Sequence, residues 1–366
     1  MVEPEIIEVT LGRESYNFSK DPGLKELEFN NAMTENNTSF KSKIGDDVVA
    51  ISVWTTPKRT KTYPFPRVYS TLGHHGKKIT IIPVQASYGK HGDDNKLQPG
   101  TISWMSGLGV YVIVGVYTKA KMRPKGKAAA NASKGKASTQ GEPVFTSFEF
   151  ENDELLEQVK EIVSNCPKVE DWNQKQLVRI PSLLKTAIEN NRRLGKELGV
   201  LVRSFKSLEK KLEVWDTDMP KFLLDSDKES EKAQHREFSS DQKLENVPGK
   251  KGKFNVDMGN SKTIFLTADS VSIDKKNKII EILEGKHTTK GKFPDENDVL
   301  DALFKLMIFK KSDITIDGIK YSKKLVCYLS GTDVATDEEV KRKYQDLIIE
   351  CKYNDIEFRF NDKTIK

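Results

Sequence analysis

The chain has 366 residues, of which 36% are hydrophobic and 31% are charged, and it carries a net charge of +6 with a pI near 8.8. No apolar run approaches the length of a membrane span and the N-terminal residues lack the pattern of a signal peptide, so we expect a cytoplasmic protein with no membrane contact. Three scattered cysteines exclude a disulfide framework and disfavour a zinc site. The mildly basic charge permits phosphate contacts without establishing them.

The first third of the chain alternates short β-like segments with Pro and Gly punctuation. We predict strands at residues 48–54, 67–72, 78–84 and 110–117. Together they indicate an N-terminal β-rich region, residues 1–150, that has possible DNA contacts.

Residues 56–69 of this region mix basic and aromatic side chains. The basic ones are Lys58, Arg59, Lys61 and Arg67. Basic groups neutralise phosphates and rings pack on sugars or bases, so the mixture suits a loop that faces DNA. A Pro-stiffened loop that covers a sheet edge explains the same composition, and both interpretations stay open.

Residues 151–250 form a predicted helical region and linker. Helical patterns occupy residues 152–164, 172–178 and 180–214. Packing of these helices on a sheet is favoured over a dimer interface or a DNA bridge. Residues 225–253 are mostly charged and polar, which indicates a linker or an approach to an active site, and either Glu237 or Glu245 could supply an additional carboxylate there.

A predicted β-hairpin at residues 263–286 organises the rest of the chain. Two apolar, β-branched runs flank a polar group, as in adjacent antiparallel strands joined by a tight turn. A two-residue turn at Lys276 and Asn277 places Asp269 directly opposite Glu284. Because strand side chains alternate with period two, Glu284 and Lys286 share one face.

Two opposed carboxylates, about 5 Å apart at their Cβ atoms, need a positive charge between them. Carboxylate oxygens, with water and substrate phosphate completing the shell, suit Mg²⁺. Lys286 could then hold the attacking water or stabilise charge on the phosphate. An ordinary cross-strand charge cluster of Asp269, Glu284 and Lys286 is the alternative.

The segment after the hairpin reads as a polar, basic loop with Lys290 and Lys292, which would meet substrate phosphates first. A strong helix is predicted at residues 295–310, a second hairpin around Asp317 and Gly318, and a capping box at Thr336 and Glu339. Core strands are predicted at residues 325–329 and 356–360. Residues 251–366 therefore form a predicted α/β core with a mixed sheet flanked by helices.

These residues resemble the PD-(D/E)XK nuclease superfamily, whose motif is an acid on one strand followed by E-x-K on the next. The block A-D-S-V-S-I-D to I-I-E-I-L-E-G-K-H-T-T-K-G-K-F-P is similar to the catalytic block of type II restriction endonucleases. Carried over residue by residue, Asp269 and Glu284 are metal ligands and Lys286 is the catalytic lysine. Ala268 stands where the motif has Pro, and Asp274 and Asp257 are alternative acids.

The resemblance implies a restriction-endonuclease-like core and a magnesium-dependent hydrolase that cleaves double-stranded DNA at specific sites. It also implies a homodimer and a cognate DNA methyltransferase as a genetic rather than a physical partner. A PD-(D/E)XK nuclease of DNA repair or recombination is the nearest alternative. A non-catalytic DNA-binding protein, in which the charge cluster is only a salt bridge, is an alternative of a different class.

Overall fold

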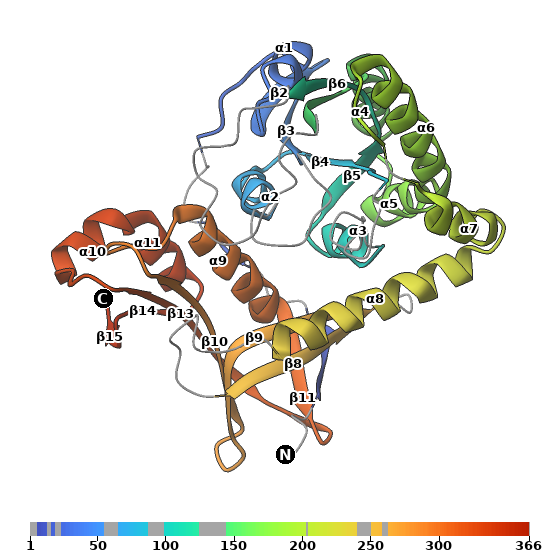
Figure 1. The fold of residues 1–366 in the computed structure, drawn as a ribbon. Helices are drawn as coiled ribbons and strands as arrows, with labels where there is room; N and C mark the ends of the chain where they lie inside the picture. Colours follow the sequence, from blue (N-terminus) through green and yellow to red (C-terminus); the bar gives the residue numbers. More distant parts are fainter. Residues whose placement is uncertain are drawn as a thin grey trace.

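The fold is α/β, with mixed sheets flanked by helices, which confirms the predicted class (Figure 1). The structure is a computed structural model. It describes residues 6–12, 16–18, 23–54, 65–86, 99–123, 144–202, 204–239, 250–257 and 263–365.

The larger sheet has nine strands and carries the predicted hairpin. In spatial order its strands are β12 (Ile319–Lys320), β11 (Ser312–Ile316), β1 (Ile6–Leu11), β8 (Lys250–Asp257), β9 (Thr263–Asp274), β10 (Ile279–Thr288), β13 (Ser322–Gly331), β14 (Ile356–Phe360) and β15 (Lys363–Thr364). β10, β13 and β14 are parallel to one another, whereas β9 is antiparallel to both β8 and β10. The N-terminal strand β1 therefore lies in the same sheet as the C-terminal hairpin.

A second sheet of four strands is built from the first third of the chain. Its strands are β2 (Ser39–Ile44), β3 (Asp47–Val53), β4 (Lys78–Pro83) and β5 (Val110–Gly115), of which the last three are parallel. Helices α2 (Phe65–Leu72) and α3 (Pro99–Gly107) connect the parallel strands and lie between the two sheets (Figure 1).

The predicted strand at residues 67–72 was wrong, because this segment is part of α2. Val68 and Leu72 are four residues apart, which places both on one face of a helix, and both are buried. α2 packs on a C-terminal helix, α9 (Glu296–Lys311). This tertiary contact overrides the β-propensity of the segment's branched and aromatic residues.

A series of helices, from residue 152 to residue 239, follows the small hairpin of β6 (Tyr117–Arg123) and β7 (Val144–Phe150) in the chain. The remaining helices are α1 (Phe29–Thr34), α4 (Asn152–Asn165), α5 (Val169–Val178), α6 (Ile180–Leu198), α7 (Lys206–Trp215), α8 (Met219–Ser239), α10 (Asp337–Lys343) and α11 (Gln345–Tyr353). The long predicted helix is split at Gly199, whose φ of 65° ends α6. Residues 225–239, predicted as linker, are helical in α8. None of the helices in the described ranges is long and apolar enough to cross a membrane.

The elements after the hairpin of β9 and β10 match their predictions. α9 occupies Glu296–Lys311, and Asp317 and Gly318 both have positive φ values, as a two-residue hairpin turn requires. Thr336 and Glu339 form the reciprocal capping box at the start of α10. Local sequence signals were therefore sufficient for these elements.

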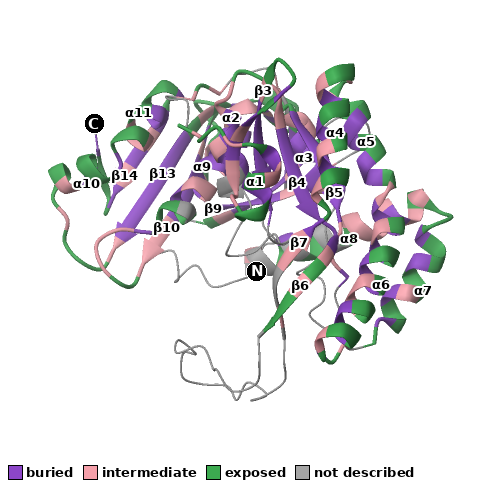
Figure 2. Ribbon diagram, turned by 90° about the horizontal axis from the view of Figure 1, so that it is seen from above, coloured by how far each residue is buried: buried purple, intermediate pink, exposed green. Residues whose placement is uncertain are grey.

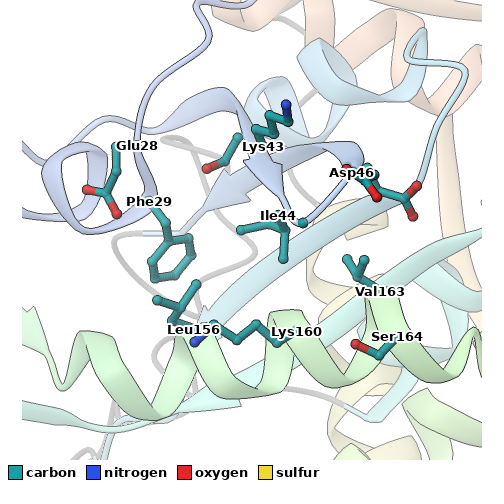
Figure 3. A pocket seen from close by; sticks show the side chains of 12 residues that line it. Glu28, Phe29, Lys43, Ile44, Asp46, Leu156, Lys160, Val163 and Ser164 are labelled. Carbon is teal, nitrogen blue, oxygen red and sulfur yellow. The ribbon is translucent and has the colours of Figure 1, made fainter.

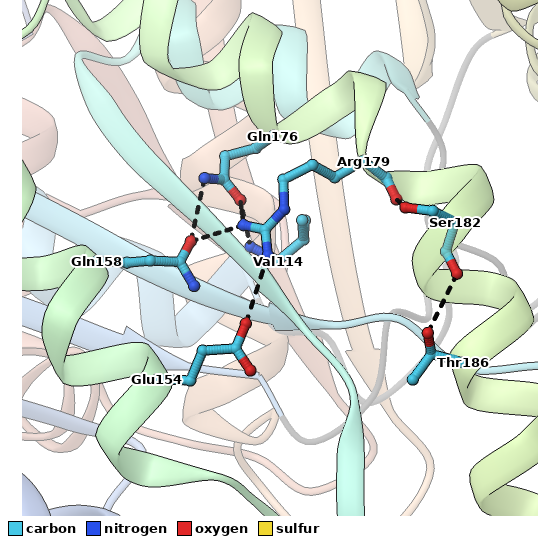
Figure 4. A network of polar contacts seen from close by, with 7 residues as sticks. All are labelled: Val114, Glu154, Gln158, Gln176, Arg179, Ser182 and Thr186. Carbon is cyan, nitrogen blue, oxygen red and sulfur yellow. Dashed lines mark hydrogen bonds and ion pairs between the residues drawn. The ribbon is translucent and has the colours of Figure 1, made fainter.

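β5 is an outer strand of the four-stranded sheet, and side chains of α5 form hydrogen bonds with its outward-facing backbone groups. Asn173 accepts a hydrogen bond from the Val112 N–H (2.7 Å) and donates to the Val110 carbonyl (2.9 Å). Gln176 accepts from the Val114 N–H (3.1 Å) and Arg179 donates to Gln176, as Figure 4 shows. These amides satisfy backbone groups of β5 that would otherwise be open to pairing with another strand.

One core joins the two sheets. Trp104 of α3 packs edge-on against Phe304 of α9, with ring centroids 5.2 Å apart. Figure 2 shows β13 and β4 buried along most of their length, whereas α6 and α7 expose one side. All three predicted regions contribute residues to this core, and the predicted boundaries at residues 150 and 250 stay a prediction.

We predict that Asn173→Ala destabilises the fold. The change leaves the Val112 N–H and the Val110 carbonyl without a buried partner, and each such loss costs about 1–3 kcal/mol. The free energy of unfolding in urea should therefore fall by about 2–6 kcal/mol. Lys175→Ala, an exposed change on the same helix, should alter it by less than about 0.5 kcal/mol. Equal effects of the two changes would contradict the edge-closing role.

Candidate active site

The hairpin has the predicted register. Ile279 pairs with Asp274 and Leu283 with Ser270, which is the alignment expected from a turn centred on Lys276 and Asn277. The loop, however, has four residues, 275–278, rather than two. The Asp274 carboxylate closes it by accepting a hydrogen bond from the Asn277 N–H (3.0 Å). The Asp274 side chain therefore stabilises the turn, which is at the opposite end of the hairpin from Glu284.

A β-bulge lies at Asp269. Gly252 of β8 pairs with Ala268, but Lys250 pairs with Val271, so Asp269 and Ser270 together oppose Lys251. A bulge changes the direction in which the side chains of a strand point. Before the bulge Leu266 and Ala268 lie in the core.

The pairing of β9 with β10 stops at Ser270, so the neighbouring Asp269 is not part of it. Ser270 and Leu283 are the last paired residues in this direction. Beyond them the Gly285 N–H donates to Asp269 Oδ2 (2.8 Å), so a side chain continues the contact between the strands. The carboxylate of Asp269 is thereby held beside the backbone that links Glu284 to Lys286.

Glu284 and Lys286 face α9, which supplies an oppositely charged partner for each. Lys305 Nζ lies 3.3 Å from Glu284 Oε2, and Lys286 Nζ lies 3.6 Å from Asp301 Oδ2. The Glu284 side chain has no exposed surface, while those of Lys286 and Lys305 are 18% and 16% exposed. A buried carboxylate is stable as an anion only when it is paired, and Lys305 supplies that pairing.

The electrostatics of Lys286 identify the members of the site. Burial lowers the pKa of Lys286, and Lys305 acts in the same direction. Attraction by Asp301, Glu284 and Asp269 outweighs both, so the pKa lies above the ordinary lysine value. Lys286 is therefore a cation at neutral pH. With Asp269, Glu284, Asp301, Lys286 and Lys305 all ionised, the cluster carries one excess negative charge.

Asp301 and Lys305 were not identified as site residues from the sequence. They stand four residues apart in α9, which places them on one face of the helix. An acid and a base at this spacing, inside an otherwise apolar helix that follows the E-x-K strand, are the signal that could have indicated them.

The predicted DNA-contacting residues are placed in part. Lys290 is exposed, whereas Lys292 Nζ lies 2.7 Å from Glu339 Oε1 at the start of α10. Arg67 lies within α2. Lys58, Arg59 and Lys61 lie outside the described residues.

The alternative carboxylates are placed only in part. Asp257 is at the exposed end of β8, opposite Thr263, and Glu237 lies within α8. Glu245 lies outside the described residues. Within those residues no three His, Cys, Asp or Glu side chains are grouped to hold a metal ion. A two-carboxylate site, with water and phosphate completing the shell, stays a prediction.

A separate pocket lies on the four-stranded half of the molecule (Figure 3). Phe29, Ile44 and Leu156 line it beside charged side chains such as Lys43 and Asp46. It takes no residue from the hairpin or from α9. The charge cluster at the hairpin, rather than this pocket, is the candidate active site.

We predict that Asp301→Asn lowers the pKa of Lys286, because it removes the strongest attraction on the ammonium group. The stability due to this raised pKa is fully present below the ordinary lysine pKa and is lost as the pH rises through the folded pKa. In Asp301→Asn the loss should begin at lower pH. NMR titration of the Lys286 side chain measures the pKa directly. Asp298→Asn, an exposed change on the same helix, should leave it unchanged, and an unchanged pKa in Asp301→Asn would contradict the assignment.

Comparison with protein-family models, curated proteins and solved structures finds no significant match to this chain. The resemblance to PD-(D/E)XK nucleases therefore depends on the motif residues, and the function is argued from the geometry of the site.

Proposed function

We propose that the chain is a magnesium-dependent endonuclease that hydrolyses phosphodiester bonds of double-stranded DNA at specific sites, a type II restriction enzyme of the PD-(D/E)XK superfamily. The observation that carries the proposal is the position of Asp269, Glu284 and Lys286. All three meet where β9 parts from β10, in a cluster with one excess negative charge. The mixed sheet, with α9 packed on β10 and β13, agrees with this fold class.

The residues at the site fit a divalent cation. Asp269 and Glu284 provide carboxylate oxygens, which are the ligands that Mg²⁺ prefers, and the local excess of negative charge favours a cation. When bound, Mg²⁺ supplies positive charge for the phosphate and makes water a better nucleophile at neutral pH.

The protein's own contribution is charge and position. Asp301 keeps Lys286 protonated and directs its ammonium group to the site. From there Lys286 can hold a phosphate oxygen or orient the attacking water, since both need a fixed positive donor. Burial of Glu284 excludes bulk water from one side of the cluster, which strengthens these interactions.

Incubation of the purified protein with plasmid DNA tests the proposal. With Mg²⁺, discrete bands are expected, and none when the metal is chelated. A smear of fragments would favour a repair or recombination nuclease of the same superfamily. DNA binding without any cleavage would favour the non-catalytic interpretation.

We predict that Glu284→Gln weakens Mg²⁺ binding and lowers the cleavage rate by on the order of 10²-fold or more, because it removes a ligand charge. Asp269→Asn should have a similar effect on cleavage and retain DNA binding. Lys286→Ala should keep the metal and lose the cleavage. Calorimetry of Mg²⁺ binding and plasmid cleavage rates measure the two effects separately.

Glu281→Gln is the matched control for these variants. Glu281 is on the same strand but pairs with Lys324 (2.6 Å) and Arg359 (3.5 Å), away from α9. Cleavage should be unaffected by this change. Full cleavage by Glu284→Gln, Asp269→Asn and Lys286→Ala alike would remove the active site from this hairpin.

We also predict that Lys290 and Lys292 differ in DNA binding. Lys290 is exposed, so its contact with a phosphate should release a counterion, and Lys290→Ala should reduce the slope of log affinity against log salt by about 1. Lys292 is already paired with Glu339, whose pKa its hydrogen bond lowers, so Lys292→Ala should change the slope less. DNA affinity of both variants, measured over a series of salt concentrations, tests this difference. A larger change for Lys292→Ala would show that its ion pair opens on DNA.

A further inference from the structure

Lys305 occupies a place at Glu284 where a divalent cation would bind. Its ammonium group lies 3.3 Å from Glu284 Oε2 and donates to the Thr267 carbonyl at 3.5 Å. Glu284 is fully buried, so its charged form needs a positive neighbour. In the structure that neighbour is a side chain of α9.

A metal ion and Lys305 are therefore competitors. A cation held by Asp269 and Glu284 would stand close to both Lys286 and Lys305, and like charges at such distances repel strongly in a buried site. Lys286 has a second carboxylate, Asp301, to hold it in place. Lys305 carries its charge on a flexible four-carbon stem and can withdraw.

We propose that Lys305 neutralises Glu284 in the resting protein and that the divalent cation displaces it from Glu284, while Asp301 retains Lys286 at the site. Metal loading is then an exchange of one cation for another at a buried carboxylate. This exchange rests on the proposed function, because it concerns the metal ligand of the same site. It makes Lys305 a residue that sets metal affinity through Glu284.

Calorimetry of Mg²⁺ binding without DNA tests the exchange. Lys305→Gln removes the competing charge and should tighten Mg²⁺ binding by at least about tenfold, since one neighbouring charge shifts ion binding at a carboxyl by one to three powers of ten. Lys305→Arg keeps the charge and should stay close to the unaltered protein. Unchanged or weaker binding by Lys305→Gln would overturn the proposal.

Lys310→Gln is the matched control. Lys310 is on the same helix and lies at the same distance, 3.3 Å, from a carboxylate, but that carboxylate is the exposed Asp355. Its substitution should leave Mg²⁺ affinity unchanged. A gain in affinity equal to that of Lys305→Gln would mean that general charge, rather than exchange at Glu284, governs binding, and would overturn the proposal.

A second measurement uses the unaltered protein, in case Lys305→Gln does not fold. An amine-reactive reagent with mass spectrometry should label Lys305 faster at saturating Mg²⁺ than without metal, relative to Lys310. Unchanged labelling of Lys305 in a protein that binds Mg²⁺ would overturn the exchange.

The two proposals fail differently. If the unaltered protein cleaves DNA with Mg²⁺ and Lys305→Gln binds the metal no more tightly, the exchange is wrong and the endonuclease proposal stands. If neither protein binds Mg²⁺ and no DNA is cleaved, the proposed function itself is wrong, and the exchange fails with it. Mg²⁺ binding by Lys305→Gln alone would support the exchange.

Discussion

The buried carboxylate of Glu284 is the constraint on which the arrangement of the site depends. A charged group with no exposed surface must have a cation beside it, and the structure provides Lys305 from α9. α9 is rotated on β10 so that Lys305 lies beside Glu284. Because Asp301 is one helical turn before Lys305, the same rotation brings Asp301 to Lys286. Pairing of one buried charge therefore positions the second pair as well.

The bulge at Asp269 provides the other half of the site. Where β9 parts from β10, the Gly285 N–H loses its place in the ladder and still needs an acceptor. Asp269 supplies it, so this carboxylate has a structural role in the resting protein in addition to its proposed role as a ligand. The parting of the strands also separates the two carboxylates from regular sheet, where opposed like charges would destabilise the pairing.

Sequence reasoning found the hairpin because its register is fixed by local features. Ile280 and Ile282 are buried on either side of the polar Glu281, and a slip of one residue would turn Glu281 to their face. The bulge was not predictable, since it depends on how β9 pairs with β8. The spacing of Asp301 and Lys305 was a signal too weak to assign them to the site, because charged residues one turn apart on a helix usually indicate a solvated face. Their function is set by a strand that only the folded chain places beside them.

α9 connects the site to the rest of the molecule. On one side it packs on β10 and β13, and on another it packs on α2, which contains the last residues of the basic and aromatic segment predicted to meet DNA. Trp104 of α3 also contacts α9 through Phe304. The helix that holds Glu284 and Lys286 in register is therefore part of the core shared by both sheets.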